Sequence, residues 1–120
     1  MIWAARDNQK TAEEDIICWK IVCCNAQNQY KSYFQLFPYT RGEKYSTKFT
    51  YTILKDYWVH GGYELNVHKG FHSYRKNSVA TRVRDGEEGT KVIKCIIPKG
   101  AKYYINKDNT EYCSNQIIIK

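Results

Sequence analysis

Hydrophobic and polar positions alternate along most of this 120-residue chain, and an alternation of period two predicts β-strands. In residues 48–54, for example, Phe49, Tyr51 and Ile53 fall on one face of an extended segment. Similar runs occupy residues 16–24, 30–37, 63–67, 71–74, 91–97, 102–105 and 111–119. Turn-forming residues separate them, at 26–29, 40–43, 61–62, 98–100 and 107–110. Pro38 is expected to end the second run, because proline cannot donate to a strand ladder.

One segment, residues 77–84, has the spacing of a helix instead. Its apolar positions form a narrow stripe of two valines and one alanine: Val79, Ala80 and Val83. Asn77 or Ser78 can cap the first turn, and Gly86 can stop the helix. The first fifteen residues, 1–15, are expected to form either a short helix or an ordered N-terminal arm.

Composition favours a single domain, residues 1–120, with one hydrophobic core. Hydrophobic residues make up 42% of the chain and charged residues 26%, which is typical of globular proteins and argues against disorder. Eleven tyrosines, four phenylalanines and three tryptophans, against two prolines, favour strands over helices. We therefore predict an α+β fold, mostly β, with an antiparallel sheet of six to eight short strands and one or two short helices.

The cysteines and the apolar runs bear on the compartment. The N-terminal residues lack the apolar run of a secretory signal, and no segment has the roughly 20 apolar residues needed to span a membrane. The cysteines show neither a CxxC pair nor the spacing of a zinc site; they are Cys18, Cys23, Cys24, Cys95 and Cys113. We expect reduced thiols in a cytoplasmic protein, with Cys95–Cys113 as the one disulfide pairing to test.

The net charge of +7 is concentrated in one stretch of the chain. Residues 1–67 hold 8 basic and 7 acidic side chains, whereas residues 68–107 hold 10 basic and 3 acidic. The last 13 residues hold 1 basic and 2 acidic. Residues 68–107 therefore carry the whole excess, which predicts a localised basic surface rather than a uniformly basic protein.

Basic and aromatic residues are interleaved in this stretch, as in surfaces that bind a phosphate backbone and stack on bases. The predicted binding residues are Lys69, His72, Tyr74, Arg75, Lys76, Arg82, Arg84, Lys91, Lys94, Lys99, Lys102, Tyr103 and Tyr104. Their partner is expected to be RNA, an RNA–protein complex or an acidic protein surface. Arg75, Lys76, Arg82 and Arg84 are expected to point away from the apolar stripe, so glutamate at all four should abolish binding with stability near wild type.

No sequence motif points to catalysis or to a cofactor. Phosphate-binding glycine loops and nucleophile elbows are absent from the sequence, and the serines have no setting that marks a nucleophile. His68 and His72 are four residues apart, but Gly70 and the neighbouring aromatic residues indicate an extended segment, where that spacing separates the two rings. We expect no enzyme activity, no metal site and no cofactor.

Two segments resemble short phage and mobile-element proteins of Bacteroidota-type bacteria. They are residues 70–74 (GFHSY) and residues 97–105 (IPKGAKYYI), together with the closing residues 111–119. These proteins have no assigned activity, but the resemblance implies a phage-encoded protein that acts inside a bacterial host. An inhibitor of a CRISPR nuclease is one such role, and a basic inhibitor suits guide RNA or an acidic face of the nuclease.

A fainter resemblance is to the core of ADP-ribosyltransferases. Residues 71–74, residues 97–100 and Glu111 follow one another in the order of that family's conserved strands. The serine–threonine–serine triplet and the Glu-x-Glu pair of the family are missing, so the resemblance implies a divergent or degenerate relative, with the activity expected to be absent if the fold is shared. A third hypothesis is a tyrosine-rich module for protein interaction or self-association. The leading hypothesis remains a non-catalytic basic binding protein.

Overall fold

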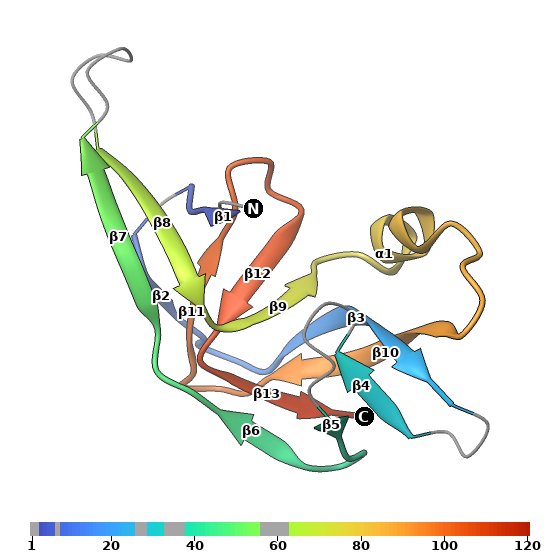
Figure 1. Ribbon diagram of the computed structural model, residues 1–120. Helices are drawn as coiled ribbons and strands as arrows, with labels where there is room; N and C mark the ends of the chain where they lie inside the picture. Colours follow the sequence, from blue (N-terminus) through green and yellow to red (C-terminus); the bar gives the residue numbers. More distant parts are fainter. Residues whose placement is uncertain (1–2, 7, 26–28, 33–37, 56–62) are drawn as a thin grey trace.

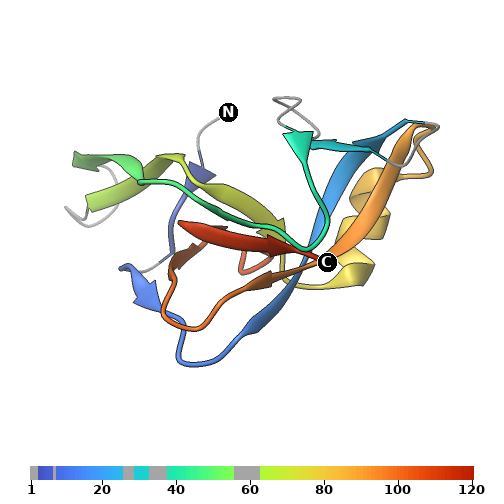
Figure 2. The same ribbon diagram turned by 90° about the horizontal axis from the view of Figure 1, so that it is seen from below.

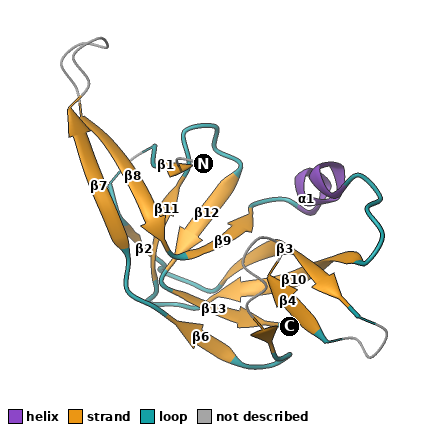
Figure 3. Cartoon of the chain, viewed as in Figure 1, coloured by secondary structure: helices purple, strands orange, loops and turns teal. Residues whose placement is uncertain are grey.

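The computed structural model describes residues 3–6, 8–25, 29–32, 38–55 and 63–120 (Figures 1 and 3). Within these residues it has thirteen strands and one helix. In chain order they are β1 (Trp3–Ala4), β2 (Lys10–Thr11), β3 (Ile16–Cys24), β4 (Tyr30–Ser32), β5 (Pro38–Tyr39), β6 (Lys44–Ser46), β7 (Thr50–Lys55), β8 (Tyr63–Lys69), β9 (Phe71–Tyr74), α1 (Asn77–Arg84), β10 (Thr90–Ile97), β11 (Lys102–Ile105), β12 (Glu111–Ser114) and β13 (Gln116–Ile119).

The strands form two antiparallel sheets. The larger follows the order β2-β11-β12-β9-β3-β10-β13-β6, with β4 pairing both β3 and β5, and the smaller follows β1-β8-β7. The predicted α+β, mostly-β class is confirmed, although thirteen described strands replace the six to eight expected. Several of the additional strands have two or three residues, and an alternation of period two cannot be recognised over so short a length.

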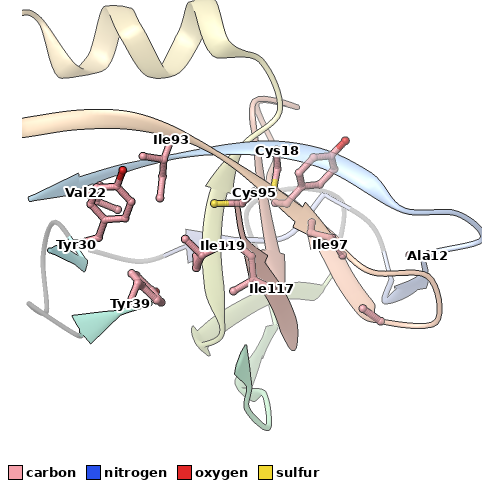
Figure 4. Packing of buried hydrophobic residues seen from close by; sticks show 12 residues of the cluster. Ala12, Cys18, Val22, Tyr30, Tyr39, Ile93, Cys95, Ile97, Ile117 and Ile119 are labelled. Carbon is pink, nitrogen blue, oxygen red and sulfur yellow. The ribbon is translucent and has the colours of Figure 1, made fainter. Parts of the chain in front are cut away.

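The main hydrophobic core lies on one face of the larger sheet (Figure 4). Cys18 and Val22 of β3 face it beside Cys95 and Ile97 of β10, and all four side chains are fully buried. Two isoleucines of β13 and two tyrosines from β4 and β5 complete its centre: Ile117, Ile119, Tyr30 and Tyr39. The opposite face of β3 and β10 is packed against α1, which Figure 2 shows lying alongside these two strands.

A second, smaller core joins the two sheets. Val67 of β8 packs with Tyr104 of β11 and Cys113 of β12, all of them buried. The ring of Phe49 meets that of Tyr104 edge-on, with centroids 5.0 Å apart. The smaller sheet thus packs at one end of the larger sheet, against β11 and β12, and α1 lies at the other end. Figure 1 shows β7 and β8 of the smaller sheet at the upper left.

The structure favours one of the two alternatives expected for residues 1–15 and contradicts the expectation for Pro38. Residues 1–15 have no helix in their described part; they contribute β1 and β2 instead, because Trp3 pairs with Val67 and Lys10 pairs with Tyr103. Pro38 does not end a strand but begins β5, opposite Lys31 of β4. Proline is tolerated there because the only described partner of β5 is β4, so β5 is an edge strand.

The predicted strand over residues 111–119 is two strands, because the chain bends at Asn115. The Oδ1 atom of Asn115 accepts a hydrogen bond from the backbone N–H of Lys102 at 2.9 Å, and its own N–H donates to the Lys102 carbonyl at 3.0 Å. The bend sends β12 to pair with β9 and β11 and β13 to pair with β10 and β6.

The helix has the predicted bounds but not the predicted N-terminal cap. Its N-cap residue is Lys76, without a side-chain cap, and the Oδ1 atom of Asn77 instead accepts a bond from the Thr81 hydroxyl at 2.8 Å. The C-cap Asp85 has a left-handed backbone with φ 50°, and Gly86 follows with φ 66°. No helix in the described parts of the chain is long and apolar enough to cross a membrane. The predicted turns at 26–29 and 61–62 lie wholly or mostly outside the described residues, as do residues 33–37 of the predicted second strand.

Candidate nucleic-acid interface

The structure divides the predicted binding residues into three groups. The first consists of exposed cations whose side chains form no hydrogen bond or ion pair within the described part of the chain: Lys69, Lys76, Arg82, Lys94 and Lys99. The second consists of cations whose side chains bond to the protein itself: Arg75, Arg84, Lys91 and Lys102. The third consists of rings that are at least partly buried: His72, Tyr74, Tyr103 and Tyr104.

Arg75 and Arg84 hold parts of the fold together. The Arg75 guanidinium bonds to the Asn109 side chain and lies 5.4 Å from the centroid of the Tyr112 ring. The Nε atom of Arg84 donates to the carbonyl and the hydroxyl of Thr90, at 3.1 and 3.0 Å, which ties the end of α1 to the start of β10. Glutamate at these two positions would remove those bonds. Replacing Arg75, Lys76, Arg82 and Arg84 together by glutamate is therefore expected to lower stability, contrary to the sequence-based expectation of near-wild-type stability.

Lys91 and Lys94 point to opposite faces of β10, as their spacing predicts. The Lys91 ammonium approaches Tyr30, 3.3 Å from its hydroxyl and 5.6 Å from its ring centroid. Lys94 lies instead on the face where α1 packs, opposite Trp19 of β3. Only Lys94 of this pair is therefore on the side of α1.

Three exposed cations gather on this side of the molecule, and we call them the helix-side cations: Lys76, Arg82 and Lys94. Lys76 begins α1 and Arg82 lies in its last turn, whereas Lys94 projects from the sheet face that α1 covers in part. Because α1 packs on β3 and β10, all three residues belong to elements on the α1 side of the larger sheet. Their exposure leaves them available to a ligand.

The cations at the other end of β10 lie beside acidic side chains. The backbone N–H of Lys99 donates to the Asp15 carboxylate at 2.8 Å. A pocket of about 640 Å³ adjoins this bond, and three of its lining side chains are carboxylates. The lining residues are Lys10, Thr11, Glu13, Glu14, Asp15, Ile16 and Tyr103. A phosphate backbone would be repelled by these carboxylates, so Lys99, Lys102 and Tyr103 are poorly placed to bind one.

Two of the predicted aromatic contacts belong to the smaller core or border it. Tyr104 is 4% exposed, and the His72 ring lies edge-on to Trp3 with centroids 5.5 Å apart. Burial, and secondarily the charge of Lys20, lowers the pKa of His72 to about 4. His72 is therefore neutral at physiological pH and adds no positive charge to the surface.

A buried lysine lies next to His72. Lys20 is 7% exposed, donates a hydrogen bond to the His72 carbonyl and has its ammonium 5.4 Å from the centroid of the Tyr39 ring. Burial lowers the pKa of Lys20. Buried lysines are unusual unless paired with a carboxylate, and no ion pair to Lys20 is found among the described residues.

Three buried thiols lie in the neighbourhood of this lysine. Burial raises the pKa of Cys18 to about 11 and that of Cys95 and Cys113 to about 12, so all three remain protonated at neutral pH. The five cysteines are free in the structure, and Cys95 lies opposite Cys18 in the sheet, not opposite Cys113. The Cys113 sulfur is 4.0 Å from His72 Nε2, yet a protonated, fully buried thiol is no nucleophile.

Replacing Lys20 with methionine is expected to raise the free energy of unfolding at pH 7. Desolvating an ammonium costs several kcal/mol, more than the roughly 1–3 kcal/mol lost when the His72 carbonyl is left unpaired. The lowered pKa of Lys20 means that its folded-state penalty grows as pH falls below 10.5. Urea denaturation should therefore show a larger gain for Lys20→Met at pH 7 than at pH 10. Lower stability of the variant at both pH values would contradict this assignment.

Comparisons with known proteins leave the family open. No family model, no curated protein and no solved structure matches the chain. The resemblances to phage proteins and to ADP-ribosyltransferases stay predictions, and nothing in the comparisons points to an enzyme. Glu111, the counterpart of the transferase glutamate, is half-buried and accepts a hydrogen bond from the Asn106 amide at 3.1 Å. No group of three metal-ligating side chains occurs among the residues that the structure describes.

Sequence reasoning did not assign Trp19 to the interface. Trp19 lies on the α1 side of the larger sheet, is half-buried and belongs to neither core. Trp3, in contrast, packs against the smaller core, and Trp58 lies outside the described residues. Because both faces of β3 are largely apolar, its alternation does not show which face is covered. No local signal could have singled out Trp19.

Proposed function

We propose that this protein is a non-catalytic RNA-binding protein that contacts phosphates through the helix-side cations. The observation that carries the proposal is that Lys76, Arg82 and Lys94 are exposed on one side of the fold. Exposed cations can bind a phosphate backbone because they release the counterions condensed on the nucleic acid. Trp19 lies directly opposite Lys94 and adds an aromatic surface next to the charge.

The wider biological role rests on the resemblance to phage proteins. If the chain is phage-encoded, its RNA would belong to a host RNA–protein complex, such as a CRISPR nuclease with its guide. Capture from lysate of the bacterial host, with and without ribonuclease treatment, tests this role. A partner lost after ribonuclease treatment supports an RNA-dependent complex, whereas an acidic protein retained after it would replace the RNA proposal.

Reversing the three helix-side charges is expected to weaken RNA binding at least tenfold. The variant Lys76→Glu/Arg82→Glu/Lys94→Glu removes cations that make no described bond, so its thermal unfolding should stay near wild type. Fluorescence anisotropy with a labelled oligouridine of about twelve nucleotides measures the affinity. The wild-type affinity should fall steeply between about 50 and 200 mM salt, and the variant should show a shallower salt dependence.

A matched charge reversal on another part of the surface separates this site from a general charge effect. Lys31, Arg41 and Lys48 are exposed and lie outside the 68–107 stretch. The variant Lys31→Glu/Arg41→Glu/Lys48→Glu changes the net charge by the same amount and should bind the oligouridine nearly as well as wild type. Equal losses in the two triple variants, or no loss in the first, would sink the proposed interface.

A further inference from the structure

A row of four side chains crosses the larger sheet on the side of α1. In this antiparallel sheet, residues directly opposite each other share a face. The register places Lys94 of β10 opposite Trp19 of β3, Trp19 opposite Tyr74 of β9, and Tyr74 opposite Glu111 of β12. The row thus has a cation at one end, two adjacent aromatic rings in the middle and a carboxylate at the other end.

The middle of this row lies between the two elements that cover the same face. On one side α1 covers Ile21, which is 8% exposed; on the other side the smaller sheet covers Tyr104, which is 4% exposed. Between them Trp19 and Tyr74 are only half-buried. Ile17, the next residue of β3 on this face, is 50% exposed. The two rings therefore belong to a part of the sheet that neither element closes off.

An apolar second row runs parallel to the first. Ile17 lies opposite Ile96, and Ile96 lies opposite Ile118 of β13. Ile96 and Ile118 are half-buried, and neither joins the two hydrophobic cores. The rings of Trp19 and Tyr74 thus adjoin a partly exposed apolar surface, which suits the flat face of a base better than it suits water.

The geometry points to a stacking platform for single-stranded RNA, in which Trp19 and Tyr74 each hold one base and Lys94 and Lys76 contact the phosphates. Two neighbouring strands present one ring each, so two bases can stack side by side. Lys76 follows Tyr74 by two residues in the chain, which places a second exposed cation near the rings. Glu111 at the far end of the row repels phosphates, so the RNA backbone runs along the Lys94 side.

Single-stranded RNA fits this surface better than the alternatives. An RNA duplex keeps its bases stacked within the helix and cannot offer their faces to Trp19 and Tyr74. An acidic peptide could pair its carboxylates with Lys94 and Lys76. Its acidic side chains, however, have no flat apolar face to stack on the two aromatic rings. The inference deepens the proposed function and depends on it, because it names the form of RNA and the residues that hold the bases.

Alanine at Trp19 or at Tyr74 is expected to weaken the binding of the labelled oligouridine about tenfold or more, because stacking contributes substantially for each base. Trp19→Phe keeps an aromatic ring and should retain most of the affinity. Tyr51→Ala is the matched control, because Tyr51 is 55% exposed on β7 of the smaller sheet. It should bind as well as wild type. An RNA duplex should bind weakly to wild type and show no dependence on Trp19.

Tryptophan fluorescence gives a second measurement that does not need an alanine variant. Stacking on uracil should quench the emission of Trp19, so the oligouridine should quench wild type more strongly than Trp19→Phe. Equal quenching of the two proteins would overturn the platform even if Trp19→Ala failed to fold.

The possible outcomes separate the two proposals. RNA binding that depends on the helix-side cations but not on Trp19 or Tyr74 would leave the proposed function standing and overturn the stacking platform. No binding of any RNA by wild type would overturn both. If a labelled poly-glutamate peptide binds more tightly than the oligouridine, and Trp19→Ala loses that peptide affinity, the same surface would be assigned to an acidic protein instead.

Discussion

Replacing Gly70 with alanine is expected to lower the free energy of unfolding by about 2 kcal/mol. Gly70 lies at the bend between β8 and β9, where an added Cβ would be 2.3 Å from the Cys113 sulfur and 3.1 Å from Cε1 of Phe49. Cys113 is fully buried in the smaller core, where close packing limits how far its sulfur can move. The chain must therefore shift at the junction of the two sheets, which close packing makes costly.

A double-mutant cycle tests the cause of this loss. Cys113→Ala removes the sulfur that the new Cβ would meet and, alone, should cost about 1 kcal/mol as a small cavity. In the double variant Gly70→Ala/Cys113→Ala the two changes should compensate in part. Its loss in the free energy of unfolding should be smaller than the sum of the two single-variant losses by at least about 1 kcal/mol. Simple additivity in urea denaturation would show that the Cys113 contact is not the cause.

Acidification from pH 7 to pH 5 is expected to lower the free energy of unfolding by about 2 kcal/mol through His72. Burial lowers the pKa of His72 from 6.5 to about 4 in the folded protein. Between pH 6.5 and pH 4, His72 is therefore protonated in the unfolded chain but not in the folded protein. Its contribution to the free energy of unfolding is fully present above pH 6.5 and is lost as pH falls toward 4. Its neighbours from other elements are Lys20 of β3, Cys113 of β12 and Trp3 of β1.

Urea denaturation of wild type and His72→Gln at several pH values measures this effect. His72→Gln should be nearly flat between pH 7 and pH 5, because glutamine does not titrate. Glu111 does not imitate the effect, since burial raises the pKa of its carboxyl and therefore favours the folded state as pH falls. A slope that persists in His72→Gln but disappears in Lys20→Met would assign the proton to Lys20 instead.

The local elements of this fold could be predicted with good accuracy. Residues 16–24, 71–74 and 102–105 are strands with the predicted bounds, and 77–84 is the predicted helix. Each has a pattern long or clear enough to show its period, bounded by turn-forming residues. The very short strands were missed because they exist only through pairing with distant strands, as Trp3 does with Val67.

The candidate site was harder to predict from the same pattern. Both faces of β3 are largely apolar, so its alternation does not show whether Lys20 or Trp19 faces the main core. The structure buries Lys20, which is 7% exposed, on the face of the main core and leaves Trp19 half-buried on the side of α1. Arg75 and Arg84, which look like the other basic residues in the sequence, prove to be bonded within the fold.

The sequence by itself determined the strand-rich class, the helix and the concentration of positive charge in residues 68–107, because these depend on composition and on neighbouring residues along the chain. Only the tertiary structure decided which of those charges are free and which rings they adjoin. The reason is that strand register and the covering of a sheet face are set by residues far apart in the chain, such as Trp19 and Lys94. The helix-side cations and the Trp19–Tyr74 row exist only once those strands are paired.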